Sequence, residues 1–98
     1  MAVWHNTYAL NNTTPVALRL HGNDKRRGST VTIQHSGHGS VYYVYLGGPG
    51  IDPATDSYGH KLSGGSSITV TGDFGAEDIM YALSSDATGE VHVMITGA

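Results

Sequence analysis

The sequence predicts an all-β domain, a small antiparallel β-sandwich or a jelly-roll-like barrel of seven to eight short strands. Runs in which apolar and polar residues alternate recur at a spacing of about 10 residues, which is typical of a sandwich or a barrel. The chain has 98 residues and 14 glycines, and many of the glycines stand between these runs, where they suit tight turns. No segment has the apolar spacing of an amphipathic helix, so we expect a single β domain over residues 1–98.

The amino-terminal part of the chain predicts two strands. Residues 1–13 alternate weakly, and we interpret them as an edge strand or as an amino-terminal arm. Residues 15–21 carry apolar side chains at the even positions, which is the pattern of a half-buried strand. Trp4 and Tyr8 then have two possible roles, packing in the core or contact with a neighbouring molecule.

Two further strands are expected on either side of a segment rich in glycine and serine. In residues 30–35, Val31 and Ile33 alternate with polar side chains, so these two point inward. Residues 41–46 follow after the segment 36–40. The simplest interpretation is a hairpin with a loop of about five residues.

Residues 41–46, with the sequence VYYVYL, are the strongest strand signal in the chain. Because alternate side chains of a strand point to opposite faces, Tyr42 lies on one face and Tyr43 and Tyr45 lie on the other. Both faces are apolar, so we expect the second sheet to cover one and a neighbouring molecule to cover the other. We therefore predict that Tyr43 and Tyr45 mediate self-association. Cover by the loop 47–61 of the same domain is the alternative, and either parity can be the buried one.

The carboxy-terminal half predicts a long loop followed by short strands. In the loop 47–61, Asp52 can cap one helical turn in which Pro53 is the first residue. The segment 63–66, Ser-Gly-Gly-Ser, predicts a turn. The expected strands are residues 58–62, 67–71, 79–83 and 90–96.

The composition excludes several kinds of chemistry. The chain has no cysteine, a net charge of −3 and no apolar run long enough to cross a bilayer, so we expect neither nucleic acid nor a membrane as a partner. We also expect no secretory signal. There are six histidines, but His35 and His38 lie in or beside a loop at a spacing that does not indicate a metal site. We therefore predict no catalytic residue, no metal ligand and no cofactor.

Three of the five basic residues lie together in the loop 22–29. They are Lys25, Arg26 and Arg27. The loop is either a solvated turn or a basic projection that docks on an acidic protein surface. Three charges are too few to indicate a nucleic-acid site.

Three segments together resemble a family of small β proteins. They are VTIQHSG at 31–37, VYLGGPGI at 44–51 and GHKLSGGSSI at 59–68. Their order resembles that of small virion proteins from the structural gene clusters of tailed bacteriophages, which include capsid decoration proteins and virion-associated modules of cupin-like or jelly-roll shape. In this pattern, His35 stands where an asparagine is expected.

The resemblance implies a structural protein, not an enzyme, that is made in the host cytoplasm and binds the outer face of an assembled capsid. Its expected partners are the major capsid protein and further copies of itself, a trimer being one possibility. We expect Trp4, Tyr8 and the basic residues 25–27 to contact the capsid. A tail or baseplate module that binds a carbohydrate receptor is the alternative, with Trp4, Tyr43 and Tyr58 stacking on sugars.

Overall fold

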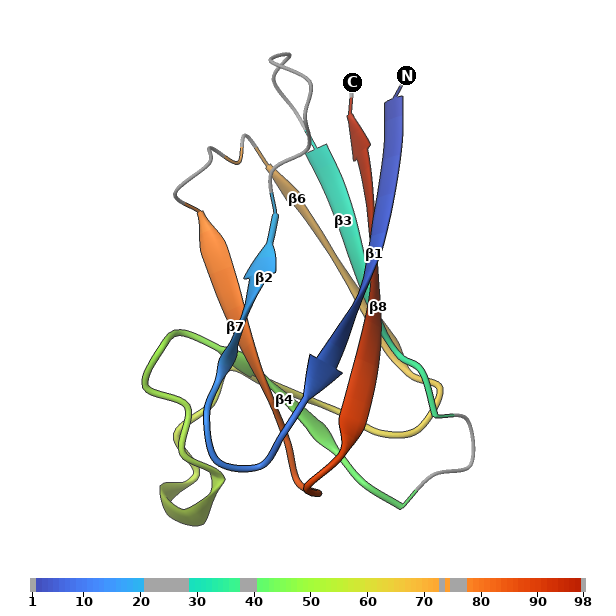
Figure 1. The fold of residues 1–98 in the computed structure, drawn as a ribbon. Helices are drawn as coiled ribbons and strands as arrows, with labels where there is room; N and C mark the ends of the chain where they lie inside the picture. The colour runs from blue at the N-terminus through green and yellow to red at the C-terminus, as the bar shows by residue number, and fades with distance from the viewer. Residues whose placement is uncertain (1, 21–28, 38–40, 73, 75–77, 98) are drawn as a thin grey trace.

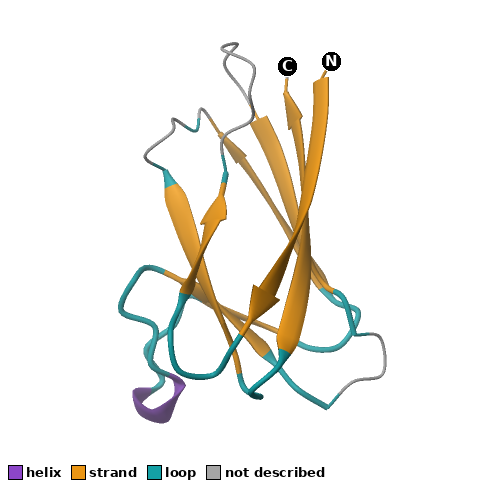
Figure 2. Cartoon of the chain, in the orientation of Figure 1, coloured by secondary structure: helices purple, strands orange, loops and turns teal. Residues whose placement is uncertain are grey.

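The computed structural model describes residues 2–20, 29–37, 41–72, 74 and 78–97 (Figure 1). These residues form eight strands and one short 3-10 helix. The strands are β1 (Ala2–Leu10), β2 (Val16–Arg19), β3 (Ser29–His35), β4 (Val44–Gly47), β5 (His60–Leu62), β6 (Ser67–Gly72), β7 (Ile79–Ser84) and β8 (Gly89–Gly97), and the helix is η1 (Pro53–Thr55). The remaining described residues are loops and turns (Figure 2), and none of the described residues belongs to a helix long and apolar enough to cross a membrane.

The strands pair as in a long hairpin that has been folded over on itself. β4 pairs with β5, β3 with β6, β2 with β7 and β1 with β8, all antiparallel. Pairing of β3 with β8 and of β4 with β7 then closes two four-stranded sheets, with the orders β1-β8-β3-β6 and β2-β7-β4-β5. This is the topology of a jelly roll, and it confirms the predicted small antiparallel β-sandwich.

The chain changes sheet at every connection between these strands except the one from β4 to β5. The predicted hairpin of residues 30–35 with residues 41–46 is therefore wrong. β3 takes both of its neighbours, β8 and β6, from later in the sequence, whereas β4 lies in the opposite sheet. A hairpin between adjacent strands needs only a short loop. In this jelly roll, however, the short connection from β3 to β4 crosses from one sheet to the other.

The core lies between the two sheets and is formed by the residues that alternation predicts. Val31, Ile33 and Leu18 have no exposed surface. Val91, Val93 and Ile95 of β8 are buried as well, while the side chains of His92 and Met94 between them are exposed. The strands that alternate, such as β3 and β8, therefore turn their apolar parity inward, as a half-buried sheet requires.

The central strand is shorter than the sequence predicts. Val44 and Leu46 are buried, but Val41 is 93% exposed and precedes the strand. The expectation that residues 41–46 form one strand with two covered faces is thus wrong for its first residues. Tyr43 precedes β4 and is bonded to Ser85, which follows β7: the Ser85 Oγ accepts the Tyr43 N–H at 2.8 Å, and the Ser85 N–H donates to the Tyr43 carbonyl at 2.9 Å.

The loop after β4 contains the predicted helical turn. Asp52 is the N-cap of η1, and its Oδ1 accepts the Ala54 N–H at 3.2 Å, while Pro53 is the first helical residue. The predicted turn at 63–66 is also present, closed by the Ser66 N–H to the Ser63 carbonyl at 3.0 Å. Gly65 in this turn has a φ of 80°, which a glycine adopts at little cost.

Substitution Asp52→Ala tests the cap. We expect the free energy of unfolding to fall by about 1 kcal/mol, because the Ala54 N–H loses its side-chain acceptor. Urea titration followed by circular dichroism measures the change. The matched variant Asp86→Ala, at another exposed turn aspartate, gives a reference for the loss of a local side-chain bond, and an equal effect of the two variants would argue against a special role of the cap.

Candidate functional site

The outer surface of the sheet β2-β7-β4-β5 is rich in aromatic side chains. Tyr45 of β4 faces outward, because its neighbours Val44 and Leu46 are the buried residues of the strand. The register places Tyr45 opposite Lys61 of β5 and Leu83 of β7, and Gly47 opposite Tyr81. We call this surface the tyrosine face, and it comprises Tyr43, Tyr45, Tyr58, Lys61, Ile79, Tyr81 and Leu83.

Lys61 and Tyr43 form the most exposed contact of the tyrosine face. Tyr43 is 40% exposed, and the Lys61 Nζ lies 4.2 Å from the centre of its ring. A cation over an aromatic face contributes about 0.5–1 kcal/mol at an exposed site. The two hydrogen bonds between the Tyr43 backbone and Ser85 hold in place the segment that carries the Tyr43 ring.

Tyr58 extends the tyrosine face from the loop between β4 and β5. Its ring packs edge to face on Tyr45, with the ring centres 4.9 Å apart. Leu83 lies opposite Tyr45 and is only 5% exposed. Cover of the tyrosine face by the domain's own loop, the alternative left open by the sequence, is therefore partial: Tyr58 shields Tyr45, but Tyr43 stays exposed.

This composition is typical of a protein-binding surface. Tyrosine and arginine are enriched at interfaces, and a tyrosine buries about 150–250 Å² when it is fully covered. Several rings therefore provide a large share of the roughly 800 Å² per partner of a standard interface. Lys61 adds one positive charge, and Arg19 of β2 lies opposite Ile79 at the margin of the tyrosine face.

Of the predicted capsid-contact residues, the structure describes Trp4 and Tyr8. Trp4 and Tyr8 of β1 are partly buried and pack against the core, the first of the two roles that the sequence left open. The Oη of Tyr8 accepts the Arg19 N–H at 3.3 Å, so this ring also connects β1 to β2. Lys25, Arg26 and Arg27 lie outside the described residues.

His35 has a structural role that the sequence does not reveal. Instead of lying on the surface, it is 1% exposed and stacks on Tyr42 with the ring centres 4.1 Å apart. The Gly37 N–H donates to its Nδ1 at 3.0 Å, so the proton is on Nε2 and is donated to the Tyr42 carbonyl at 2.9 Å. Both ring nitrogens are therefore used within the fold. His38 lies outside the described residues, and within the described ranges no three histidine, aspartate or glutamate side chains are grouped to hold a metal ion.

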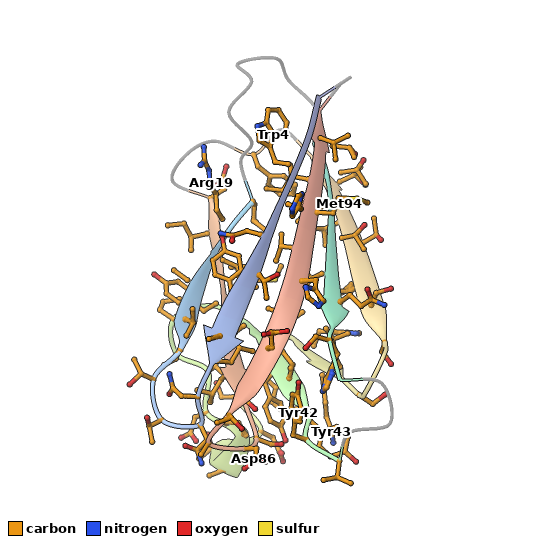
Figure 3. The ribbon with its side chains drawn as sticks, turned by 45° about the vertical axis from the view of Figure 1, so that its right-hand side comes forward. Trp4, Arg19, Tyr42, Tyr43, Asp86 and Met94 are labelled. Atoms are coloured by element: carbon orange, nitrogen blue, oxygen red, sulfur yellow. The ribbon has the colours of Figure 1, made fainter. Side chains whose placement is uncertain are left out.

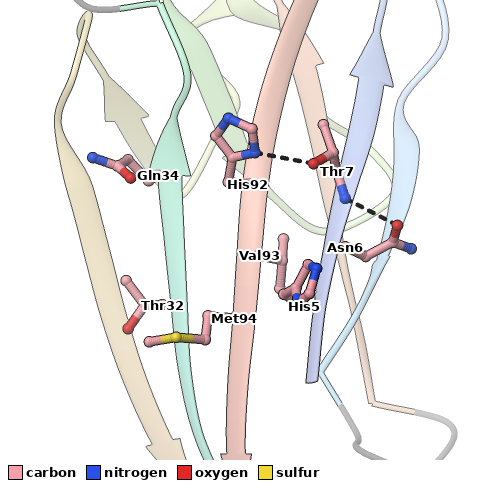
Figure 4. Close-up of a pocket in the computed structure, with 8 residues that line it drawn as sticks. All are labelled: His5, Asn6, Thr7, Thr32, Gln34, His92, Val93 and Met94. Carbon is pink, nitrogen blue, oxygen red and sulfur yellow. Dashed lines mark hydrogen bonds between the residues drawn. The ribbon is translucent and has the colours of Figure 1, made fainter. Parts of the chain in front are cut away.

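A hollow lies on the outer face of the other sheet, β1-β8-β3-β6 (Figure 4). It has a volume of about 190 Å³, and β1, β8 and β3 supply its lining. The His92 Nδ1 lies 3.0 Å from the Thr7 Oγ1, and the His92 Nε2 lies 3.8 Å from a carboxylate oxygen of the exposed Glu90. A contact this exposed contributes little to stability. No Phe, Trp or Tyr lines the hollow, and we do not assign it a function.

Comparison of the chain with protein-family models, with curated proteins and with solved structures found no match.

The sequence indicates Tyr43 and Tyr45 as contact residues, but it does not indicate the rest of the tyrosine face. Ile79 and Tyr81 alternate with Met80 and Ala82 in a run that is apolar at every position, so their outward direction has no local signal. Only the pairing of β7 with β4 and β2 shows that they join Tyr45 on one surface. The alternation of polar residues, which identifies the outer face in the other strands, is missing here.

Proposed function

We propose that this protein is a structural component of a bacteriophage virion, a capsid decoration protein that binds the outer surface of the assembled shell. The observation that carries the proposal is the tyrosine face, an exposed aromatic surface on a small jelly roll. A protein that stabilises a capsid bridges neighbouring subunits of the shell. It therefore requires an exposed interface and not an enclosed cleft. The family resemblance of residues 31–37, 44–51 and 59–68 supports the same role.

We assign the contact with the shell to the tyrosine face. The sequence suggested this surface for contact between copies, and Trp4, Tyr8 and residues 25–27 for contact with the capsid. Because Trp4 and Tyr8 pack inward, they offer less surface to a partner than Tyr43 and Tyr58, which are 40% and 37% exposed. A contact of the basic residues 25–27 with an acidic shell surface stays a prediction.

Quantitative mass spectrometry of purified virions tests the proposed role, with particles of a phage that carries the gene for this chain. A decoration protein is expected at a copy number comparable to that of the major capsid protein. A few copies per particle would indicate a tail or baseplate module instead. Absence from washed particles would overturn the proposal.

Binding of tyrosine-face variants to shells that lack the protein tests the assigned surface. The double substitution Tyr43→Ala/Tyr58→Ala is expected to weaken binding by about tenfold or more, because exposed tyrosines at interface centres are frequent hot spots. The control Thr69→Ala/Met94→Ala removes exposed side chains from the other sheet and is expected to bind normally. Equal binding of both variants would exclude the tyrosine face as the docking surface.

Carbohydrate binding has less support from the arrangement of the aromatic residues. Trp4 and Tyr43, two of the three rings considered for it, lie at opposite ends of the molecule (Figure 3). Tyr43 already carries Lys61 over its ring, and Tyr58 presents its ring to Tyr45. These three side chains do not form one platform on which a sugar could stack.

A further inference from the structure

Four strands form the edges of the two sheets, and β1 is the least protected of them. Among the described residues no strand pairs with the edge of β1 that faces away from β8. The other edge strands are shorter: β6 has six residues, β2 has four and ends on Arg19, and β5 has three and contains Lys61. β1 has nine residues and contains neither proline nor any Asp, Glu, Lys or Arg. Natural proteins usually protect an edge of this length, since it can pair with a further strand.

The free edge of β1 presents the backbone groups of its odd-numbered residues. The Thr7 N–H donates to the Asn6 Oδ1 at 2.9 Å (Figure 4), so it is not used in the ladder with β8. In an antiparallel pair, successive residues direct their backbone groups to opposite sides. Val3, His5 and Ala9 therefore direct their N–H and C=O groups to the same free edge as Thr7.

The residues of β1 on either side of Asn6 match in kind, although not in identity. If two copies of the strand pair antiparallel around a two-fold axis at Asn6, His5 lies opposite Thr7 and Val3 lies opposite Ala9. On the inner side, Trp4 of one copy lies opposite Tyr8 of the other. The odd-numbered pairs exchange backbone hydrogen bonds, and the Trp4–Tyr8 pairs join two aromatic rings, a favourable cross-strand combination.

An open cleft next to Tyr8 provides room for this arrangement. It has a volume of about 360 Å³ and lies between β1 and β2, lined by Tyr8, Ala17, Leu18, Arg19 and Ile79. The two-fold axis brings Trp4 of the second copy to Tyr8, at the border of this cleft. The Asn6 side chain must release the Thr7 N–H, and a second Asn6 across the axis offers it a new amide partner.

We infer that β1 is a self-pairing edge, which joins two copies of this chain into a two-fold dimer with one continuous sheet. Its occupant is a second copy, because pairing β1 with itself about Asn6 places aromatic opposite aromatic and uncharged opposite uncharged residues, with each contact made twice, as in an isologous interface. The inference does not depend on the proposed virion role. It also leaves the tyrosine face free, since that surface belongs to the other sheet.

Charge substitutions at Val3 and Ala9 test the register. Both side chains are exposed, and within one chain they are six positions apart, about 20 Å along the strand. The variant Val3→Lys/Ala9→Lys places like charges opposite each other across the axis, and we expect at least a tenfold increase in the dimer dissociation constant. The variant Val3→Lys/Ala9→Glu places opposite charges there and is expected to dimerise within threefold of the wild type. Sedimentation equilibrium measures both, with Thr71→Lys on the opposite edge strand β6 as the neutral control.

Disulfide formation gives an independent measurement, since the natural chain has no cysteine. Asn6→Cys places a thiol on the two-fold axis at a non-hydrogen-bonded position, where the Cα atoms lie about 4.5 Å apart, which a disulfide can span. Mild oxidation is expected to convert this variant to a covalent dimer, whereas Thr71→Cys stays largely monomeric. A wild-type monomer at the highest attainable concentration, equal dissociation constants for the two charge variants, or equal cross-linking of the two cysteine variants would each overturn the inference. Circular dichroism melts confirm that all variants are folded.

Discussion

Substitution His35→Ala is expected to lower the free energy of unfolding by about 3–4 kcal/mol. The side chain is 1% exposed, so its removal leaves a cavity between the sheets. The Tyr42 carbonyl and the Gly37 N–H both lose their hydrogen-bond partner, and Tyr42 loses the ring stacked on it. Denaturant unfolding monitored by tyrosine fluorescence and circular dichroism measures the loss, which is a large part of the about 5–15 kcal/mol typical of a small domain.

Two matched variants show which part of the His35 effect comes from hydrogen bonding. His35→Asn introduces the residue that the family pattern leads us to expect, and a short amide at this position can still accept the Gly37 N–H two residues on. We expect a loss of about half that of His35→Ala, because the bond to the Tyr42 carbonyl is not restored. His60→Ala removes an exposed histidine and is expected to cost less than about 0.5 kcal/mol. If His35→Ala cost no more than His60→Ala, the packing described for His35 would be wrong.

Substitution Gly89→Ala is expected to destabilise the fold by about 2–3 kcal/mol, because there is no room for a methyl group. A Cβ at this position would lie 2.5 Å from the Ser84 Oγ, 2.8 Å from the Ser84 Cβ and 3.2 Å from the Tyr42 Cε2. Ser84 cannot readily turn away, since it is buried and its Oγ accepts the Asp86 N–H at 3.1 Å. The measurement is again the free energy of unfolding from denaturant titration.

A double-mutant cycle separates this steric clash from a general effect of glycine. Ser84→Gly removes the two nearest atoms that a methyl group at position 89 would meet, so Ser84→Gly/Gly89→Ala is expected to be more stable than the sum of the single changes by at least about 1 kcal/mol. Gly48→Ala is the control, because a Cβ there would have no atom within 4 Å. Strict additivity of the two substitutions would contradict the clash.

The strands and their inward faces could largely be predicted from local pattern. Val31 and Ile33 in β3, and Val91 and Val93 in β8, are buried because they alternate with polar residues on a pleated strand. The cap at Asp52 was also predictable, since an aspartate before a proline combines a side-chain acceptor with a preset φ. In each case the relevant interactions lie within a few residues along the chain.

The tyrosine face was predictable only in part. The VYYVYL segment indicates an outward pair of tyrosines, but it is apolar on both faces and therefore does not show which parity faces the solvent. The contribution of Tyr81 depends on the pairing of β7 with β4, which joins residues far apart in the sequence. His35 was missed for a related reason: its partner Tyr42 follows after a loop that changes sheet, and no local pattern reports that crossing.

The amino-acid sequence alone determined the fold class, the approximate positions of the strands and the side of most strands that is buried, because the two-residue period of a strand is a local property of the chain. Only the tertiary structure decided which strands are neighbours, which tyrosines reach the solvent and which strands form the edges of the sheets. Those features follow from antiparallel pairing between distant segments, where β1 meets β8 and β2 meets β7. Such pairings depend on how two complete sheets close around a common core, and the pattern of a single segment does not contain that information.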